Sequence, residues 1–329
     1  FRAEAVWLPI NPRNSVATNV DLLTRFDGDL LFYHSDYADE AQQIMDAVPS
    51  IREAVCIDGD ATVGSTLEKW SEGHPETHQI GPVDLDATFA VFPTGGTTGK
   101  SKGVVLNHRS VFTMCQNFYA HFNYHDETCH LVVAPMTHSA GIIGSLHFAR
   151  GGTNVVMSNA APDLICDAID KYRVSHLFLP PTVVYMMLAL PDVKDRDYSS
   201  LQHFLVGAAP TSVEKLKEAV SVFGPVMTEA FGQSEAPAAI TAKAPWDYID
   251  KDGNINERRL ASIGRPCVNN RVAILDEDGT ELKRGHAGEI CIQGDLVSPG
   301  YYKNPEATAE VRQFGWHHTG DVGVMDDEG

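Results

Sequence analysis

Short apolar runs alternate with amphipathic stretches along most of this chain, and that alternation limits the fold more than any other feature. Runs rich in β-branched residues predict strands, whereas apolar residues three or four positions apart predict helices. The predicted strands cover residues 5–9, 30–34, 54–57, 89–93, 104–107, 131–134, 154–157, 176–179 and 203–206. The predicted helices cover residues 40–48, 109–121, 161–172 and 212–223. This alternation predicts an α/β fold with two doubly wound, mostly parallel sheets and flanking helices.

After about residue 244 the pattern changes to short apolar runs separated by turn sequences such as Asp-Glu-Asp-Gly. The runs at 271–275, 288–293 and 322–325 predict a small antiparallel β subdomain. We therefore expect three subdomains, with boundaries at residues 1–152, 153–262 and 263–329. Ligands of parallel α/β sheets bind beyond the carboxyl ends of the strands, so a binding site is expected there.

The charge balance excludes one large class of partners. The chain carries 25 Lys+Arg against 44 Asp+Glu, a net charge of −19, which would repel a nucleic-acid backbone. The longest apolar run, 177–191, is too short for a membrane span and contains Pro180 and Pro181, so it predicts a buried strand followed by a helix. The six cysteines show no CxxC pattern, which favours reduced core cysteines and a cytoplasmic location. Whether the protein forms a homodimer is left open.

A glycine- and threonine-rich loop joins the predicted strands at 89–93 and 104–107 and reads Thr94-Gly95-Gly96-Thr97-Thr98-Gly99-Lys100-Ser101-Lys102-Gly103. Glycines allow backbone N–H groups to converge on one point, and the hydroxyls and lysines add donors and positive charge, as a polyphosphate requires. A P-loop would need a glycine where Thr94 stands and a helix where a strand follows. The alternative interpretation is that this segment is a flexible hairpin that binds nothing.

The loop resembles the phosphate-binding signature of the adenylate-forming superfamily, which includes acyl-CoA synthetases, and departs from the usual pattern by Ser101 in place of proline. Further segments similar to family motifs follow in order at 134–141, 206–210, 228–235, 288–290, 300–305 and 318–321. The resemblance implies that the chain starts within the family's large domain and ends before its small C-terminal domain, which carries a catalytic lysine.

The resemblance assigns residues to the nucleotide. It implies that the phosphates are held by Thr94, Gly95, Gly96, Thr97, Thr98, Gly99 and Lys102. The adenine is expected against Gly207, Ala208, Ala209, Pro210, Phe231 and Gly232. Ser234 is expected to meet phosphate, Glu235 to hold Mg²⁺, and Asp321 to bind the ribose hydroxyls. The residues expected to take part directly in catalysis are Thr97, Lys102, His138 and Glu235.

The same resemblance implies the reaction. A carboxylate attacks the α-phosphorus of ATP, pyrophosphate leaves, and coenzyme A displaces AMP from the acyl-adenylate to give a thioester. His138 is expected to border the acyl pocket, where no nearby carboxylate could pair a substrate amine, so a plain aliphatic or aromatic acid is favoured. The alternatives are a nucleotide- and acyl-binding fragment without turnover and an enzyme that loads a carrier protein.

Several of these residues also have ordinary structural interpretations. His138 could be a core histidine, Phe231 a core aromatic residue, and Glu235 and Asp321 surface acids. A zinc site at His121, His125, Cys129 and His130 would need ligand geometry that the intervening loop sequence does not favour. His317 and His318 are expected to belong to the turn that carries Asp321.

Overall fold

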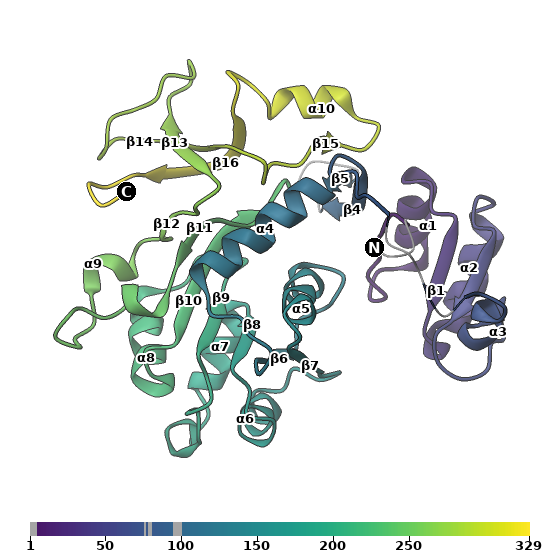
Figure 1. Cartoon of the computed structure of the whole chain (residues 1–329), viewed down its shortest axis with the longest axis horizontal. Coiled ribbons are helices and arrows are strands. Elements are labelled where there is room, and N and C mark those ends of the chain that lie inside the picture. The colour runs from purple at the N-terminus through teal and green to yellow at the C-terminus, as the bar shows by residue number, and fades with distance from the viewer. Residues whose placement is uncertain (1–4, 76, 78–80, 95–100) are drawn as a thin grey trace. The chain divides into compact units, whose positions relative to one another are not determined.

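The computed structural model describes residues 5–75, 77, 81–94 and 101–329, and the chain divides into two compact units (Figure 1). Unit 1 comprises Phe1–His108 with Pro299–Pro305, and unit 2 comprises Arg109–Ser298 with Glu306–Gly329. The three subdomains expected at 1–152, 153–262 and 263–329 stay a prediction.

Unit 1 contains a parallel sheet, β1-β2-β3, and an antiparallel sheet, β15-β5-β4. Its elements are α1 (Val16–Arg25), β1 (Leu30–Tyr33), α2 (Ala38–Ala47), β2 (Glu53–Cys56), β3 (Ser65–Thr66), α3 (Leu67–Ser71), β4 (Thr88–Thr94), β5 (Lys102–Asn107) and β15 (Gly300–Tyr301). The strand expected at 5–9 is reduced to one bridge from Trp7 to Ala90. Pro9 and Pro12 lack the N–H groups that a longer ladder would need.

Unit 2 is built on a seven-stranded sheet in the order β12-β11-β10-β9-β8-β6-β7. The strands from β6 to β10 run parallel, and β11 and β12 are antiparallel to their neighbours. Its strands are β6 (Cys129–Val132), β7 (Thr153–Val156), β8 (His176–Leu179), β9 (His203–Val206), β10 (Met227–Gln233), β11 (Ala236–Lys243) and β12 (Arg265–Pro266). Its helices are α4 (His108–His121), α5 (Ser139–Ala149), α6 (Pro162–Lys171), α7 (Pro181–Leu188), α8 (Val213–Phe223) and α9 (Glu257–Leu260).

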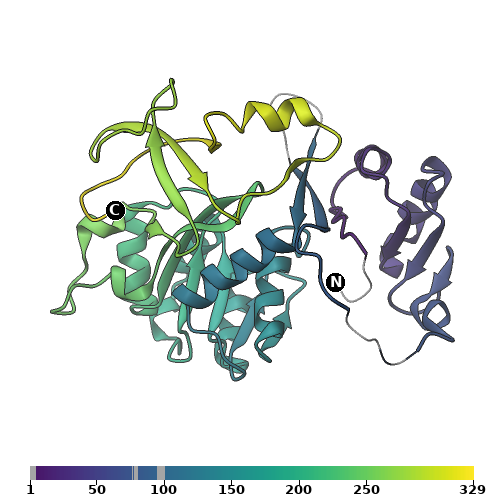
Figure 2. The ribbon, with the colours of Figure 1, turned by 45° about the horizontal axis from the view of Figure 1, so that its top comes forward.

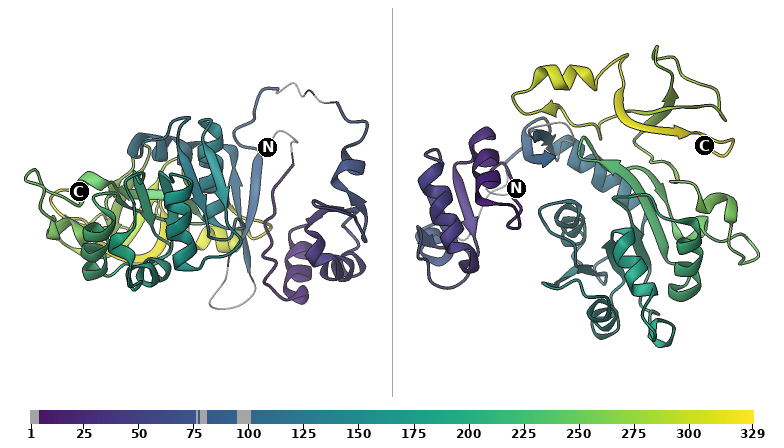
Figure 3. Two further views of the ribbon diagram at one scale, coloured as in Figure 1. Left: turned by 90° about the horizontal axis from the view of Figure 1, so that it is seen from below. Right: turned by 180° about the vertical axis from the view of Figure 1, so that it is seen from behind.

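Alternate residues of the parallel strands face opposite sides of this sheet, and each side is covered by its own helices (Figures 1 and 3). Leu131, Leu177 and Phe204 pack with α6, α7 and α8 in one large apolar cluster. On the opposite side, α5 contacts β6 and β7, and the ring of Phe122, just after α4, lies 5.4 Å from that of His203. The sheet is therefore buried on both faces, as the near-continuous apolar strands predict.

A second, antiparallel sheet of unit 2 has the order β13-β14-β16, and a short helix, α10, precedes β16 (Figure 2). These elements are β13 (Arg271–Leu275), β14 (Ala287–Gln293), α10 (Pro305–Glu310) and β16 (His317–Val324). Trp316 packs against Ala273, Leu275 and Cys291, and the Arg271 guanidinium lies 4.7 Å from its ring centre. The predicted α/β fold with an additional antiparallel β unit is thus confirmed.

All six cysteines are free thiols, as expected for reduced core cysteines. Within the part of the chain that the structure describes, no helix combines the length and the apolarity needed to cross a membrane.

Four histidines are buried on the α4–α5 side of the unit 2 sheet. His130, His176 and His203 lie side by side near the starts of β6, β8 and β9, and His147 reaches them from α5. All four rings are at most 6% exposed. Burial lowers the pKa of His130 and of His203 to about 4, and that of His176 to about 3. The fold therefore keeps these rings neutral near pH 7.

A lysine is also buried completely, at the end of β11. The Lys243 ammonium donates to the carbonyl oxygens of Arg259, Leu260 and Ser262 at 3.1, 3.1 and 2.7 Å. It also forms an ion pair with Glu229, whose carboxylate accepts from the Tyr248 hydroxyl at 2.7 Å. This network connects β10, β11 and the segment around α9 through a side chain that is 1% exposed.

We predict that Lys243→Met destabilises the protein by about 3–5 kcal/mol, because the Glu229 carboxylate and the carbonyl groups would stay buried without their cation. Denaturant unfolding followed by circular dichroism measures this free energy. Lys217→Met is the matched control, since Lys217 pairs with Glu214 and Glu257 at the surface and its loss should cost less than about 1 kcal/mol. A loss of similar size in both variants would contradict the prediction.

The buried histidines predict that stability falls with acid. A histidine whose folded-state pKa lies below its unfolded value of about 6.5 stabilises the fold fully above that value, and the contribution is lost as pH falls toward the folded pKa. Between pH 6.5 and pH 5 the expected loss is on the order of 1–2 kcal/mol per histidine. Urea midpoints at the two pH values measure it.

His147→Phe removes one of these groups and should flatten the pH dependence, whereas His286→Ala, at an exposed position, should leave the slope unchanged. Equal midpoints at pH 6.5 and pH 5 in the unsubstituted protein would disprove the assignment.

Candidate functional site

The first predicted binding segment is the turn after β9. Gly207, Ala208, Ala209 and Pro210 follow the carboxyl end of this central strand, and the last three are exposed. Ala208 has a left-handed backbone with φ 68°. Such a conformation costs alanine on the order of 1–2 kcal/mol, and residues held in this way cluster at binding sites. A Cβ on Gly207 would lie 3.3 Å from the Ala230 carbonyl oxygen, so β10 approaches this turn closely.

The next segment is the β10–β11 hairpin beside that turn. Phe231 is half-buried and pairs with Thr241, while Ser234 at the tip is exposed and Glu235 is half-buried. A Cβ on Gly232 would lie 2.8 Å from the Ala238 backbone, so the close approach of the two strands requires glycine here. The hairpin thus presents an aromatic ring, a hydroxyl and a carboxylate at the carboxyl edge of the sheet.

Asp321 lies on a bulge of β16. The β14–β16 pairing is regular up to Glu289 opposite Val322 and resumes with Cys291 opposite His318. Three residues, Thr319, Gly320 and Asp321, therefore stand opposite the single residue between Glu289 and Cys291. Asp321 is exposed on this bulge, with its N–H donating to the Thr319 hydroxyl at 3.1 Å.

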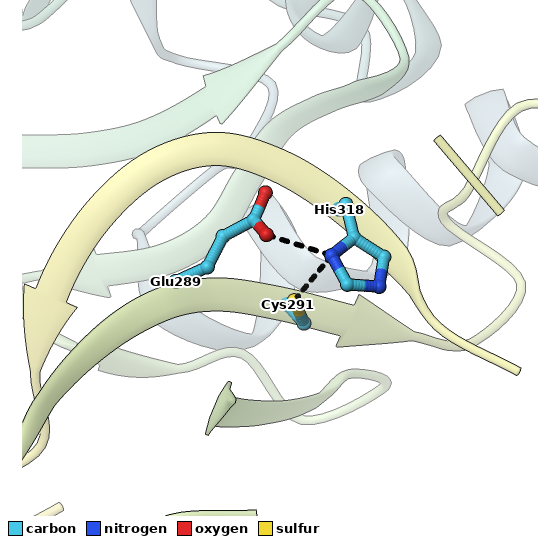
Figure 4. A group of neighbouring side chains, drawn as sticks. All are labelled: Glu289, Cys291 and His318. Atoms are coloured by element: carbon cyan, nitrogen blue, oxygen red, sulfur yellow. Dashed lines mark hydrogen bonds and ion pairs between the residues drawn. The ribbon is translucent and has the colours of Figure 1, made fainter. Parts of the chain in front are cut away.

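Glu289 holds the bulge from the neighbouring strand (Figure 4). One carboxylate oxygen accepts from the Gly320 N–H at 2.8 Å, and the other lies 2.7 Å from Nδ1 of His318. The Thr319 hydroxyl donates to the Ile290 carbonyl at 2.7 Å, which adds a third bond across the same pair of strands. These bonds fix the backbone immediately before Asp321.

Glu289, Cys291 and His318 also place three potential metal-ligand atoms within 4.8 Å of one another. Burial raises the pKa of the Cys291 thiol to about 12, so it stays protonated and is a poor metal ligand. Nε2 of His318 lies 3.2 Å from the Gln313 carbonyl oxygen, and Nδ1 already faces Glu289. The proximity of these groups is therefore explained by hydrogen bonding without a metal ion.

A hydrogen bond connects the β10 segment with β16. Nε2 of Gln233 and Nε2 of His317 lie 2.9 Å apart. Burial lowers the pKa of His317 to about 4, so this ring is neutral and accepts from the Gln233 amide. Gln233, which directly precedes Ser234, is thereby attached to His317, which lies four positions before Asp321. Unit 2 thus brings the predicted segment at 228–235 close to His317, the residue directly before the predicted segment at 318–321.

Thr94 and Lys102, the two ends of the glycine- and threonine-rich segment, belong to unit 1. Thr94 pairs with Lys102 at the ends of β4 and β5, and its hydroxyl donates to the Lys102 carbonyl at 3.2 Å. The Lys102 ammonium lies 4.9 Å from the centre of the Tyr301 ring. The other predicted phosphate-binding residues of the loop, Gly95, Gly96, Thr97, Thr98 and Gly99, lie outside the described residues.

His138 is exposed at the N-cap of α5, so it is not a core histidine. Since α5 follows β6, His138 lies at the same edge of the sheet as the turn after β9. The zinc site considered for His121, His125, Cys129 and His130 has no support, because these residues form no ligand cluster within the described ranges.

Comparison with known proteins relates most of the chain to one enzyme family. The model of the AMP-binding enzyme family matches residues 1–302. The chain belongs to this family. The medium/long-chain-fatty-acid–CoA ligase FadD8 of Mycobacterium tuberculosis is 33% identical over 89% of this chain and 49% of its own length. A feruloyl-CoA synthase of Amycolatopsis sp. is 31% identical over 75% of this chain and 49% of its own length.

Among solved structures, the amide bond synthetase McbA of Marinactinospora thermotolerans superposes with a TM-score of 0.88 at 26% identity. The match covers 99% of this chain and 63% of McbA. The chain spans about half the length of the two curated relatives named above. This chain therefore has the fold of an AMP-binding enzyme, and the relatives named here are a CoA ligase, a CoA synthase and an amide bond synthetase.

Two features of the site were missed from the sequence. Glu289 was recognised only as a family landmark, because its role depends on a neighbouring strand some thirty residues later. The histidine group had a signal, since two predicted strands, 176–179 and 203–206, both begin with histidine. Equal positions in neighbouring parallel strands lie side by side, so this repetition was the signal that could have placed the two rings together, although the sequence analysis did not use it.

We predict that Glu289→Ala loosens the Asp321 bulge, because the Gly320 N–H and His318 lose the carboxylate that both contact. A hydrogen bond to a charged group contributes about 1.5–3 kcal/mol, so the Gly320 amide should exchange its hydrogen about tenfold faster or more. Amide exchange measured by NMR tests this. Glu281→Ala, which removes a surface partner of Arg271, serves as the control; unchanged exchange at Gly320 in both variants would show that the bulge does not depend on Glu289.

Proposed function

We propose that this chain is the nucleotide- and acid-binding part of an ATP-dependent carboxylate–CoA ligase. In the proposed reaction an acid and ATP form an acyl-adenylate and pyrophosphate, and coenzyme A then displaces AMP. The observation that carries the proposal is the arrangement in unit 2, where the β9 turn lies against β10 and a hydrogen bond joins Gln233 of β10 to His317, four positions before Asp321. Reduced cysteines favour a cytoplasmic location for this activity.

The proposed nucleotide site uses each of these segments. The ring of Phe231 and the turn at 207–210 hold the adenine. Asp321 accepts hydrogen bonds from the ribose hydroxyls, a task for which an exposed carboxylate on a fixed backbone is suited. The loop from Thr94 to Lys102, including Thr97, binds the phosphates through its N–H groups, hydroxyls and lysine.

Magnesium fits the donor set at the tip of the β10–β11 hairpin. Glu235 offers carboxylate oxygens and the adjacent Ser234 an exposed hydroxyl, and Mg²⁺ prefers such hard oxygen ligands together with phosphate oxygens and water. The ion would supply charge neutralisation at the phosphates. Glu235 would hold it, and Ser234 would donate to a phosphate oxygen.

His138 is proposed to border the acid. Its exposed position at the start of α5 leaves the ring accessible from the carboxyl edge of the sheet. A carboxylate placed there would lie at the same edge of the sheet as the turn at 207–210 and the proposed adenine site. Relatives named for fatty acids and for ferulate indicate that this family accepts both aliphatic and aromatic acids.

We predict that Asp321→Ala weakens ATP binding by about tenfold to a hundredfold, since a charge-assisted hydrogen bond contributes about 1.5–3 kcal/mol. Isothermal titration of the chain with ATP and Mg²⁺ measures the affinity. Asp278→Ala, at an exposed position in the turn after β13, is the control. Equal ATP affinity in both variants and the unsubstituted chain would refute the site.

The reaction itself is tested by acid-dependent exchange of label between pyrophosphate and ATP, using aliphatic and aromatic acids. Exchange with one acid class is the expected result and identifies the substrate. ATP binding without exchange would instead favour a binding fragment without turnover. If exchange occurs, analysis of the thioester product separates a coenzyme A acceptor from a carrier protein.

A further inference from the structure

Two lysines of unit 1 lie over the rings of two consecutive tyrosines. The Lys102 ammonium is 4.9 Å from the centre of the Tyr301 ring, and the Lys303 ammonium is 5.3 Å from the centre of the Tyr302 ring. Both distances are within the range at which a cation is attracted to the electron-rich face of an aromatic ring. The two lysines differ in whether a carboxylate also holds them.

Lys303 is paired with an acid. Its ammonium forms an ion pair with Asp27 at 2.5 Å, and the same carboxylate accepts a hydrogen bond from the Tyr302 hydroxyl at 2.6 Å. These contacts attach the segment that follows β15 to the residues directly after α1. The positive charge of Lys303 is therefore used within the protein.

Lys102 has no acidic partner. Among the residues that the structure describes, no carboxylate forms an ion pair with its ammonium, although the chain has a net charge of −19. An aromatic face attracts a cation without cancelling its charge, whereas a carboxylate would hold the lysine and neutralise it as well. Lys102 is therefore held in a way that leaves its full positive charge for an anion.

The register of β15 against β5 places the ring over the lysine (Figure 1). Tyr301 stands opposite Val104, and the Tyr302 N–H donates to the Gly103 carbonyl at 2.7 Å. Residues two positions apart in a strand face the same side, so Lys102 lies diagonally across from Tyr301 on one face of the sheet. Backbone pairing, and not the lysine itself, therefore determines where this ring lies.

The other face of the same strand is fixed by packing. A Cβ on Gly103 would lie 2.6 Å from the Phe26 ring and 2.8 Å from the Val91 side chain, so this close approach requires glycine. Phe26 is buried, and its ring lies 6.2 Å from that of Tyr302. The backbone at the start of β5 is thus held from both sides. Only the flexible stem of Lys102 remains to be ordered, and the tyrosine ring contacts its end.

We propose that Tyr301 is a positioning residue for Lys102, whose ammonium it holds in place for the phosphates of a nucleotide without neutralising it. This inference rests on the proposed function, in which Lys102 contacts the phosphates, and adds the residue that orders this lysine. A ligand that must itself order a long side chain loses about twofold to tenfold in affinity. The Tyr301 ring reduces this loss, because the ammonium is already held before the ligand binds.

The experiment compares the binding of ATP and of adenosine to variants of Tyr301, by ligand-observed NMR with Mg²⁺ present. Tyr301→Leu removes the aromatic face, so it should weaken ATP binding by about twofold to tenfold and leave adenosine binding unchanged. Tyr301→Phe keeps the face and should bind ATP as the unsubstituted chain does. The proposal is overturned if Tyr301→Leu weakens both ligands equally or neither of them, or if Tyr301→Phe loses as much ATP affinity as Tyr301→Leu.

A double-mutant cycle shows whether Tyr301 acts through Lys102. In the Lys102→Met background, Tyr301→Leu should have no further effect on ATP affinity, because the charge that the ring holds is absent. Lys303→Met is the matched control, since it removes the neighbouring lysine–tyrosine contact and an exposed ion pair. ATP affinity should not change in this control. A full effect of Tyr301→Leu without Lys102, or an equal loss in Lys303→Met, would contradict the proposal, and thermal midpoints show that each variant is folded.

The position of the lysine can also be measured without a ligand. The ring current of Tyr301 should shift the ε-methylene protons of Lys102 upfield of those of lysines without a ring contact, and Tyr301→Leu should remove this shift. NMR of the chain with isotope-labelled lysine measures it, and the resonance is assigned by its loss in Lys102→Met. An unshifted resonance in the unsubstituted chain would show that the ring does not hold the ammonium.

These measurements separate this inference from the proposed function. If ATP binds and Asp321→Ala weakens it, but Tyr301→Leu does not, only the role of Tyr301 is wrong. If ATP does not bind to the unsubstituted chain, the proposed function fails. Inorganic triphosphate then takes the place of ATP, and a triphosphate affinity that is absent or is unchanged by Tyr301→Leu overturns the inference as well.

Discussion

The two-sided burial of the seven-stranded sheet is the constraint on which unit 2 depends. A parallel strand buried on both faces sends alternate side chains into two different environments. On the side of α6, α7 and α8 these environments are uniformly apolar, and Leu177, Phe204 and Met227 fill them. On the side of α4 and α5, the same strands contribute His130, His176 and His203 together with Phe178 and Leu205. The first side stabilises the fold, and the second contains the buried histidines.

The carboxyl edge of this sheet is shaped by hydrogen bonds more than by packing. Asp321 is exposed and has no apolar cluster to hold it, yet its bulge is attached to β14 through Glu289 and to the β10 segment through His317 and Gln233. Each bond uses a strand neighbour that is distant in sequence. A carboxylate that must meet ribose hydroxyls benefits from this arrangement, because the ordering of its backbone is complete before a ligand binds.

The elements of the fold were largely predictable from the sequence, because the apolar pattern records burial directly. The helices expected at 161–172 and 212–223 appear as α6 and α8 within one residue at each end. The expected strand at 5–9 was wrong as an extended strand, since two nearby prolines interrupt its hydrogen bonds. The strands at 89–93 and 104–107 exist but pair antiparallel with each other, because the sequence between them is shorter than the roughly one dozen residues that a parallel crossover needs.

The candidate site was predictable only where a motif is local. The segments around Phe231 and Asp321 could be selected from short stretches, whereas the function of Glu289 follows from a strand pairing that no local pattern records.

The tautomers of His130 and His147 depend on their hydrogen bonds with Asn154 and Thr128. These bonds form only in the folded chain, so no local sequence pattern predicts them. A core could fill the same volume with leucine and gain stability, because neutral imidazoles in a core pay for the desolvation of their nitrogens. Both ring nitrogens of His203 have a hydrogen-bond partner, which offsets this desolvation. In His130 and in His147 only Nδ1 has a partner, so the offset is about half as large. Rings that share one wall of the core thus differ in how many of their nitrogen atoms have a hydrogen-bond partner in the protein.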